Sequence, residues 1–409
     1  MIAPWYTAAQ MQIYSLYLHI PFCHHRCSYC DFNTYAGIET LVPDYVEALC
    51  HEICFVAHSY SQKIPIQTIF LGGGTPSILP SDQLKRIFIT IQREFDLQGG
   101  LEITLEANPD RLSFDYLKSI VEMGITRLSL GMQSANPEDL QLLERQHGYY
   151  QVAKAVSLLR KAGVRNLNLD LIFGIPNQSL SSWQRTIELA TSLNPDHLSL
   201  YSLTIENGTP MGDWLRKGLL VEPDQDIAAQ MYELAQEKLS ILGYQQYEIS
   251  NWARQDQSGE LLACQHNLQY WRNLPYLGLG AGAHGYANGV RTENESNPWS
   301  YIQRLSAPID GDKLSASFPI TPAVVNWQSI TREDEMKETM LMGLRLTQDG
   351  ISRKAFLARF GTSMEDIFGT EIEHSIQSGL LEWAQQNDDR LRLTPRGRLL
   401  GNQVFMQFV

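Results

Sequence analysis

The residues best suited to chemistry are three cysteines near the start of the chain, Cys23, Cys27 and Cys30, spaced C-x3-C-x2-C. They follow a strand-like apolar run, and their thiolates are close enough in sequence to bind one common group. This spacing suits an iron–sulfur cluster, which an all-cysteine site holds with four thiolates. The next cysteines, Cys50 and Cys54, lie on a later predicted helix, where we expect core packing. One iron would therefore keep a position open for a ligand that is not protein.

A zinc site is the alternative, because His24 or His25 could supply a fourth ligand. Zinc sites more often pair two C-x2-C hooks from distant segments, which this chain lacks. The pattern therefore favours the cluster.

Further candidates follow the later predicted strands. Residues 71–76, Leu-Gly-Gly-Gly-Thr-Pro, place three glycines at the end of the second strand, which indicates that bare backbone is needed there. Glu106, Gln133 and Asp170 end three later strands, and Asp170 lies between apolar residues. A buried carboxylate needs partners, so we expect these side chains to line a site. Arg145 receives no role from sequence chemistry alone.

The elements that position these residues alternate between short apolar strands and amphipathic helices, which predicts an α/β fold. Six strands are each followed by a helix, which indicates either a doubly wound sheet or a partial (βα) barrel. In both folds ligands gather at the carboxyl ends of the strands. The predicted strands are 14–20, 66–71, 101–106, 126–132, 166–173 and 197–203, and the predicted helices are 43–58, 81–95, 113–123, 137–145, 149–162, 182–193 and 224–242.

The second half of the chain changes character. We expect a short N-terminal extension (1–13), the (βα) region (14–245), a loop-rich extension (246–325) and a C-terminal, mostly helical, winged-helix-like domain (326–409). The glycines at 278–285 suggest backbone that closely approaches a ligand or another segment. We expect the C-terminal domain to serve as a lid or a partner surface.

Composition narrows the classes of function. The chain has 32 basic and 45 acidic residues, a net charge of −13, which argues against nucleic acid as a partner. Six cysteines without a disulfide-like pattern indicate a reduced, cytoplasmic protein. We find no signal peptide and no run of 18 apolar residues that would span a membrane.

Taken together, these motifs resemble the radical S-adenosylmethionine (SAM) superfamily, which shares the C-x3-C-x2-C signature and a glycine-rich SAM-binding motif. The similarity extends over nearly the whole chain to the oxygen-independent coproporphyrinogen III oxidase group. It is carried by residues 17–23, 106–109, 131–134, 144–146 and 170–176.

The resemblance implies a partial (βα)6 radical SAM barrel with a [4Fe–4S] cluster on Cys23, Cys27 and Cys30. SAM would chelate the open iron through its amino and carboxylate groups, and reduction would split it into methionine and a 5′-deoxyadenosyl radical. By motif position, Tyr17, Gly73 and Glu106 would contact this SAM. The positions that hold a second SAM in the oxidases are matched by Tyr29, Gly74, Thr75, Gln133, Arg145, Asp170 and Thr204.

Two departures point to one branch of the group. The oxidases continue their motif to a further cysteine where this chain has Phe32, and they carry a longer N-terminal extension. Residues 266–271 instead match the H-N-x-x-Y-W pattern of the HemW branch, the heme chaperones. The implied heme-binding residues are His266, Asn267, Tyr270 and Trp271, in a glycine-rich loop that would offer an axial nitrogen and a flat apolar surface. Without the resemblance, His266 is better interpreted as a hydrogen-bonded structural histidine.

The first hypothesis is therefore a heme chaperone that retains a SAM-liganded cluster and passes heme to heme-requiring proteins. The second is an enzyme, an oxygen-independent coproporphyrinogen III oxidase, since the residues for SAM cleavage are present. Peripheral membrane contact, a homodimer and the number of SAM molecules are left open by the sequence.

Overall fold

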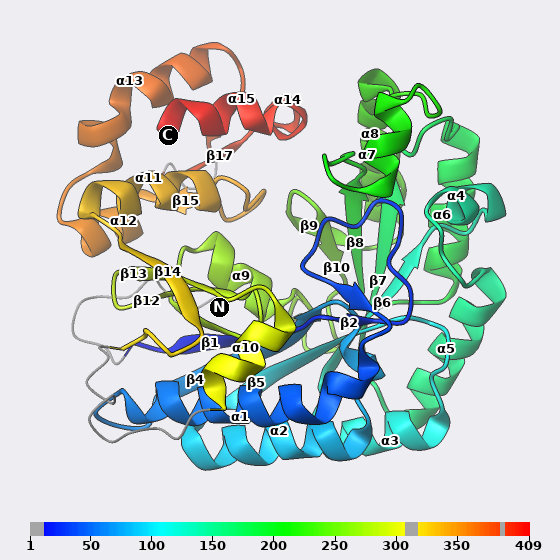
Figure 1. Cartoon of the computed structure of the whole chain (residues 1–409). Coiled ribbons are helices and arrows are strands. Elements are labelled where there is room, and N and C mark those ends of the chain that lie inside the picture. Colours follow the sequence, from blue (N-terminus) through cyan, green and yellow to red (C-terminus); the bar gives the residue numbers. More distant parts are fainter. Residues whose placement is uncertain (1–11, 307–317, 385–388) are drawn as a thin grey trace.

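The computed structural model describes residues 12–306, 318–384 and 389–409. The expected extension 1–13 lies almost wholly outside these residues. The described part is built on one long sheet, with a smaller domain at one end (Figure 1). Six parallel neighbours form its centre: β1 (Tyr14–Ile20), β4 (Pro65–Gly73), β5 (Asp96–Ala107), β6 (Arg127–Gln133), β7 (Asn166–Phe173) and β8 (His197–Ser202).

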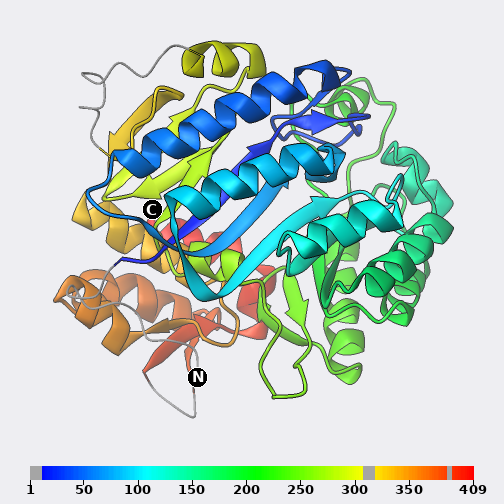
Figure 2. The ribbon, with the colours of Figure 1, turned by 90° about the horizontal axis from the view of Figure 1, so that it is seen from below.

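Helices follow these strands and cover the outer face of the sheet, as the view from below shows for α1 and α2 (Figure 2). Three helices begin where a side chain accepts a backbone N–H: Ser113, Ser179 and Asp224 cap α3, α6 and α8. The partial (βα)6 barrel is therefore confirmed. The helices are α1 (Val42–His58), α2 (Ser81–Glu94), α3 (Phe114–Glu122), α4 (Pro137–Leu142), α5 (Tyr149–Ala162), α6 (Leu180–Ser192), α7 (Pro210–Arg216) and α8 (Gln225–Ile241).

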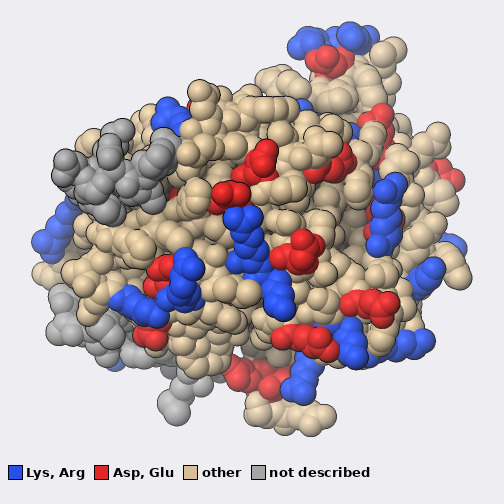
Figure 3. Space-filling model, turned by 60° about the horizontal axis from the view of Figure 1, so that its bottom comes forward, with Lys and Arg blue, Asp and Glu red and all other residues tan. Residues whose placement is uncertain are grey.

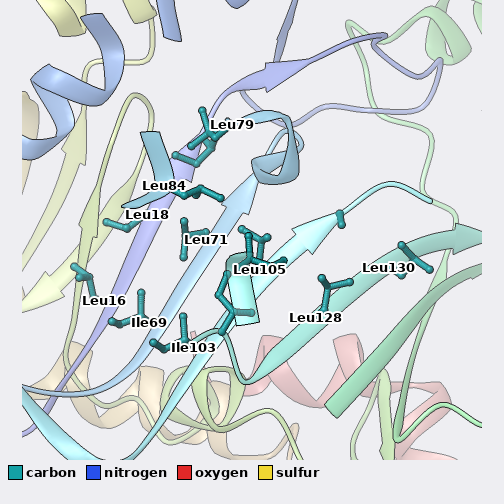
Figure 4. Close-up of a cluster of buried hydrophobic side chains, with 14 of the residues drawn as sticks. Leu16, Leu18, Ile69, Leu71, Leu79, Leu84, Ile103, Leu105, Leu128 and Leu130 are labelled. Atoms are coloured by element: carbon teal, nitrogen blue, oxygen red, sulfur yellow. The ribbon is translucent and has the colours of Figure 1, made fainter. Parts of the chain in front are cut away.

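The main core fills the space between the central strands and these helices (Figure 4). Leu16 and Leu18 of β1 and Leu71 of β4 have no exposed surface. Strands of a parallel sheet are covered on both faces, which is why β1 is apolar almost throughout. This packing holds the strand ends, and hence the residues that follow them, in fixed positions.

The segment 246–325 was expected to be loop-rich, and this expectation is wrong for much of it. Its strands extend the central sheet at both edges, beyond β8 and beyond β1. Helix α10 (Pro298–Leu305) then packs on α1. The added strands are β10 (Asn251–Ala253) and β9 (Gln245–Glu248) on one side, and β11 (Tyr276–Leu279), β12 (His284–Ala287), β13 (Val290–Asn294) and β14 (Val324–Ser329) on the other.

The glycines of this segment serve a close approach to another segment, as their number suggested. A Cβ on Gly280 would lie 2.5 Å from the carbonyl oxygen of His19, and one on Gly282 would lie 2.5 Å from Nδ2 of Asn33. Both glycines also have positive φ, of 100° and 76°. The strand before the cysteine motif and the loop after it are thus packed against the extension.

The C-terminal domain has a winged-helix topology and its own apolar core. A three-stranded sheet of order β15-β17-β16 closes one side of its helices. The domain docks on β9, where the Thr347 N–H donates to the Tyr247 carbonyl over 3.1 Å. Its elements are α11 (Arg332–Gly343), β15 (Ile351–Ser352), α12 (Arg353–Phe360), α13 (Met364–Gln377), β16 (Leu381–Trp383), β17 (Arg390–Leu393), α14 (Pro395–Leu399) and α15 (Gly401–Phe405).

On the face that Figure 3 presents, basic and acidic side chains are interspersed rather than segregated. Pairs such as Arg86–Glu47 and Lys118–Glu122, at 3.5 and 3.9 Å, are examples of this mixing on the outer helices. Among the helices of the described residues, none is both long and apolar enough to cross a bilayer.

Candidate cofactor site at the carboxyl end of the barrel

The three motif cysteines line one cavity of about 460 Å³ at the carboxyl ends of the central strands. Cys23 ends the short strand β2 (Phe22–Cys23), and Cys27 and Cys30 lie in the loop that leads to β3 (Tyr35–Ala36). Burial raises the pKa of the Cys23 thiol to about 11 in the absence of a bound cation. Three thiols are thus brought to one space, as the spacing predicts.

Arg145 connects the cysteine loop to the strand ends. One guanidinium nitrogen donates to the sulfur of Cys27 over 3.4 Å, and the other donates to Oδ1 of Asn108 over 2.6 Å and to the carbonyl of Gly131 over 3.1 Å. Its Nε is buried without a partner among the described residues. Arg145, which sequence chemistry alone gave no role, is therefore a partly buried cation of the site.

The glycine motif forms the adjoining wall. The Gly74 and Thr75 N–H groups donate to the carbonyls of Ile20 and Phe22, both over 2.8 Å, which ties the motif to the strand that precedes the cysteines. A Cβ on Gly74 would lie 2.6 Å from the Phe22 carbonyl oxygen, and one on Gly73 would lie 2.4 Å from the His19 ring. Any larger residue would push the cysteine strand away from this wall.

Two partly buried carboxyl groups, those of Glu106 and Asp170, also line the cavity. Glu106 accepts from the Gly73 N–H over 3.1 Å, and Asp170 accepts from the Ser129 hydroxyl and the Asn168 amide, each over 2.8 Å. Desolvation, followed by the charge of Asp170, raises the pKa of Glu106 to about 8. Desolvation likewise raises the pKa of Asp170. Both groups therefore hold a proton more strongly than an exposed carboxyl group does.

Tyr17 does not line this cavity; it lies below it, in the barrel. Since Nε2 of His19 donates to the Asn33 carbonyl over 2.9 Å, its Nδ1 accepts from the Tyr17 hydroxyl over 3.0 Å. Tyr17 can therefore act on the site through His19 and the cysteine loop. The other nine expected SAM residues do line the cavity: Tyr29, Gly73, Gly74, Thr75, Glu106, Gln133, Arg145, Asp170 and Thr204.

Several residues of the cavity were not predicted. Asn108 lies in the same motif as Glu106, and its amide donates to the Thr75 hydroxyl over 3.1 Å. Its place in that motif could have indicated it from the sequence. Ser129 and Tyr201 lie on β6 and β8, and only their position near strand ends could have indicated them. Phe32 lies at the edge of the cavity with 63% of its surface exposed.

The residues 266–271 lie elsewhere, on the short helix α9 (Gln265–Trp271) rather than in a glycine-rich loop, so that expectation is wrong. The carboxylate of Glu102 accepts the N–H groups of Gln265 and His266 over 3.1 and 3.0 Å, which anchors the helix start to β5. The ring of His266 lies 5.1 Å from that of Phe70 on β4. Glu102 and the cavity residue Glu106 lie four residues apart on β5 and therefore on the same face of the sheet, so α9 packs on the face that also bears the cysteine cavity, nearer the start of β5.

In this conformation His266 has no free ring nitrogen. Thr68 donates to Ser15 over 2.7 Å, so it accepts from Nδ1 of His266 over 2.8 Å, and Nε2 then accepts from the Tyr270 hydroxyl over 2.9 Å. The residue is 1% exposed, and burial lowers its pKa to about 3. Asn267 is partly exposed on the same helix. The arrangement makes His266 a neutral, fully bonded histidine.

The lining of the cavity fits the cluster and the SAM that the resemblance implies. The three thiols share one cavity with an unsatisfied arginine donor and two proton-holding carboxyl groups. The remaining cysteines, Cys50, Cys54 and Cys264, do not line it. Among the described residues, no three His, Cys, Asp or Glu side chains converge on a single metal ion. The three thiols of the cavity fit a group that takes three thiolates, as the implied cluster does.

Comparisons with known proteins agree with this geometry. The model of the radical SAM superfamily matches residues 17–190, and that of the HemN C-terminal domain matches residues 330–400. The heme chaperone HemW of Bacillus subtilis is 37% identical, with 97% of this chain and 99% of that protein covered. HemW of Escherichia coli is 34% identical, with 97% of this chain and 98% of that protein covered.

Among solved structures, coproporphyrinogen III oxidase (HemN) from Escherichia coli, described as a radical SAM enzyme, has a TM-score of 0.79 at 22% identity, covering 98% of this chain and 90% of that one. This likeness supports the fold. The identity over essentially full length places the sequence more narrowly: the chain belongs to the heme chaperone HemW family of the radical SAM superfamily.

Proposed function

We propose that this protein binds heme and transfers it to acceptor heme proteins, and that it carries a SAM-coordinated [4Fe–4S] cluster. The observation that carries the proposal is the similarity to HemW chaperones along nearly the whole length of both chains. The position after the cysteine motif supports it, because Phe32 stands where the oxidases have a further cysteine.

For the cluster, we propose Cys23, Cys27 and Cys30 as thiolate ligands, with the Arg145 guanidinium stabilising the sulfur of Cys27. When bound and reduced, the cluster supplies an electron for reductive cleavage of SAM. The residues of the chain would hold and orient SAM. Glu106 would offer a carboxyl group to its ammonium, and the bare backbone at Gly73 and Gly74 would let it approach closely.

Glu106 also has to release its proton to pair with a cation. Its pKa of about 8 means that it is largely protonated at neutral pH before the ligand enters. Binding a positive group replaces that proton, because an opposite charge favours the ionised carboxylate. Tyr29, Thr75, Gln133, Asp170 and Thr204 are proposed for a second SAM or for the remainder of the same cavity.

For heme, the structure argues against His266 as a ready axial ligand, since both ring nitrogens are bonded. We therefore place heme binding at the junction that α9 forms with the C-terminal domain, without assigning the iron to His266. The proposed partners are proteins that accept heme.

The second candidate, coproporphyrinogen III oxidase, is tested directly. The chain is reconstituted with iron and sulfide without oxygen and given SAM, a reductant and coproporphyrinogen III. We expect no protoporphyrinogen IX beyond one equivalent per chain. Many turnovers would overturn the chaperone proposal, and HemN under the same conditions serves as the positive control.

A further inference from the structure

A second cavity, of about 370 Å³, lies in the seam where the C-terminal domain docks beside β9. This seam cavity is distinct from the cysteine site, with which it shares no lining residue. Two arginines, Arg345 and Arg398, contribute its charged lining, and the rest is mostly apolar or backbone. The remaining lining residues are Ile249, Leu399, Leu400, Gly401, Asn402, Gln403 and Phe405.

Arg345 is a partly buried cation without a partner for its hydrogen bonds. Among the described residues, no hydrogen bond or ion pair joins its guanidinium to another side chain or carbonyl, and its Nε is buried and unsatisfied. Its guanidinium carbon lies 4.4 Å from the ring centre of Trp271 and 5.9 Å from that of Phe405. The two rings hold the charge in place without using its donors.

Arg398 brings a second cation to the same space. Its Nη1 donates to Oε1 of Gln246 over 3.1 Å and its Nη2 donates to the Thr347 carbonyl over 3.5 Å, whereas its Nε is also buried and unsatisfied. Two partly buried guanidinium groups, each with a buried and unsatisfied Nε, are costly unless an acceptor enters the cavity.

The nearby charges leave these arginines without a paired carboxylate. Glu248 does not line the cavity and forms no ion pair with either of them among the described residues, but it is near enough for the charge of Arg345 to favour its ionised form; its Oε1 accepts from the Ser250 N–H over 2.9 Å and from Asn251. Glu382 pairs with Arg392 over 2.9 Å. The cavity therefore has a net positive lining and an apolar wall.

We propose that the seam cavity binds a carboxylate of a flat amphipathic ligand, with Arg345 and Arg398 holding the anion and Leu399, Leu400 and Phe405 contacting the apolar body. Guanidinium groups match carboxylates through paired N–H donors. The volume is at the low end of the ~300–1,000 Å³ typical of small-molecule sites, so it admits an edge of a large ligand.

The inference rests on the proposed function in one respect: the ligand it names is the propionate-bearing edge of heme. It also gives Trp271 a role. The last residue of the 266–271 motif would position Arg345 for the propionate rather than stack on the porphyrin.

The test compares heme with heme dimethyl ester, whose propionates are neutral and whose iron is unchanged. Both are titrated into the full chain and followed by the Soret band, for the natural protein and for Arg345→Gln and Arg398→Gln. Arg396→Gln is the matched control, because this exposed arginine lies on α14 but outside the cavity.

We expect each cavity variant to bind heme at least about tenfold more weakly, since a hydrogen bond to a charged group contributes roughly 1.5–3 kcal/mol. The same variants should bind the dimethyl ester as the natural protein does, and Arg396→Gln should behave as the natural protein with both ligands. The comparison of heme with its ester in the natural protein requires no variant. It therefore still tests the proposal if a variant fails to fold.

Equal affinity of the natural protein for heme and its ester, with both variants unaffected, would overturn the seam cavity as the propionate site and leave the chaperone proposal standing. Absence of any heme binding by the natural protein would overturn the proposed function and this inference with it.

Discussion

The guanidinium of Arg345 lies over the ring of Trp271, 4.4 Å from its centre. This contact joins the helix that carries the 266–271 motif to the C-terminal domain. It also occupies a ring face that the sequence would assign to a porphyrin. Under the propionate proposal, Trp271 positions the cation that the ligand would bind.

This relationship predicts that Trp271→Leu weakens heme binding several-fold, because an unpositioned Arg345 loses a cation–π contact of roughly 0.5–2 kcal/mol. Trp271→Phe, which keeps a ring, should have a smaller effect. Heme titration of the single variants and of Trp271→Leu combined with Arg345→Gln checks the coupling. Fully additive losses in the double variant would show that the two residues act separately.

Removing one motif cysteine should remove the cluster. We expect Cys27→Ala, after anaerobic reconstitution, to lose its brown chromophore and most of its iron, because two thiolates do not retain the cluster. Cys50→Ala is the control, since Cys50 is buried in the main core beside α2 and away from the cavity. Iron assay and the visible spectrum are the measurements, and unchanged iron in Cys27→Ala would mean that the ligand assignment is wrong.

His266 should contribute to stability. Its replacement by Ala leaves Thr68 and Tyr270 without their bonds and opens a cavity, so we expect a loss of about 2–4 kcal/mol in the free energy of unfolding. Tyr270→Phe removes one of these bonds and should cost about 1 kcal/mol. Urea unfolding of the heme-free protein measures both. A His266→Ala protein of natural stability that has lost the Soret shift would instead identify an axial ligand.

Glu106 makes the stability of the ligand-free protein depend on pH. Its pKa is raised from 4.5 to about 8, so the folded state binds the proton more tightly than the unfolded chain. Ionisation of Glu106 in the folded state lowers the free energy of unfolding. This loss is absent below about pH 4.5, grows as the pH rises, and is complete above about pH 8.

Glu106→Gln removes that cost, which at about 1.4 kcal/mol per unit of pKa amounts to a few kcal/mol. We expect the variant to exceed the natural protein in Tm at pH 8.5 by several degrees more than at pH 5. Glu373→Gln, an exposed change on α13, should show no such trend. A Tm difference that is the same at both pH values would contradict the burial of Glu106 as a titrating group.

The barrel and most of its site could be predicted from the sequence because their signals are local. The six central strands are apolar runs between glycine- and proline-containing turns, and Glu106 and Gln133 follow from their position at strand ends. Asp170 lies within β7, and its signal is a carboxyl group among apolar residues. Cys23, Cys27 and Cys30 follow from their spacing.

What could not be predicted depends on contacts between distant segments. Glu52, on α1, accepts hydrogen bonds from the Gly280 N–H, the Asn294 amide and the hydroxyls of Tyr301 and Thr321, at 2.6–2.8 Å. This buried carboxyl group, whose pKa burial raises, fixes the extension to the barrel. In sequence it is an ordinary helix glutamate.

The same reason explains the errors around residues 246–325. The strands β9 to β13 are short, and each becomes a strand only because an edge of the sheet is available to pair with it. The bonds that fix His266 come from Thr68 and Tyr270, one of them on a distant strand. The hydrophobic periodicity of the sequence shows neither the pairing of these short strands nor the hydrogen bonds of His266.

The measurement that tests the central claim most directly is heme transfer. The heme-loaded chain, with its cluster reconstituted and SAM present, is mixed with an excess of a heme-free acceptor hemoprotein, and the two are separated and read by their Soret spectra. The account predicts that heme moves to the acceptor in near-stoichiometric amount, faster than from serum albumin as a non-specific donor. Heme that stays on the chain, or that leaves no faster than from albumin, would contradict it.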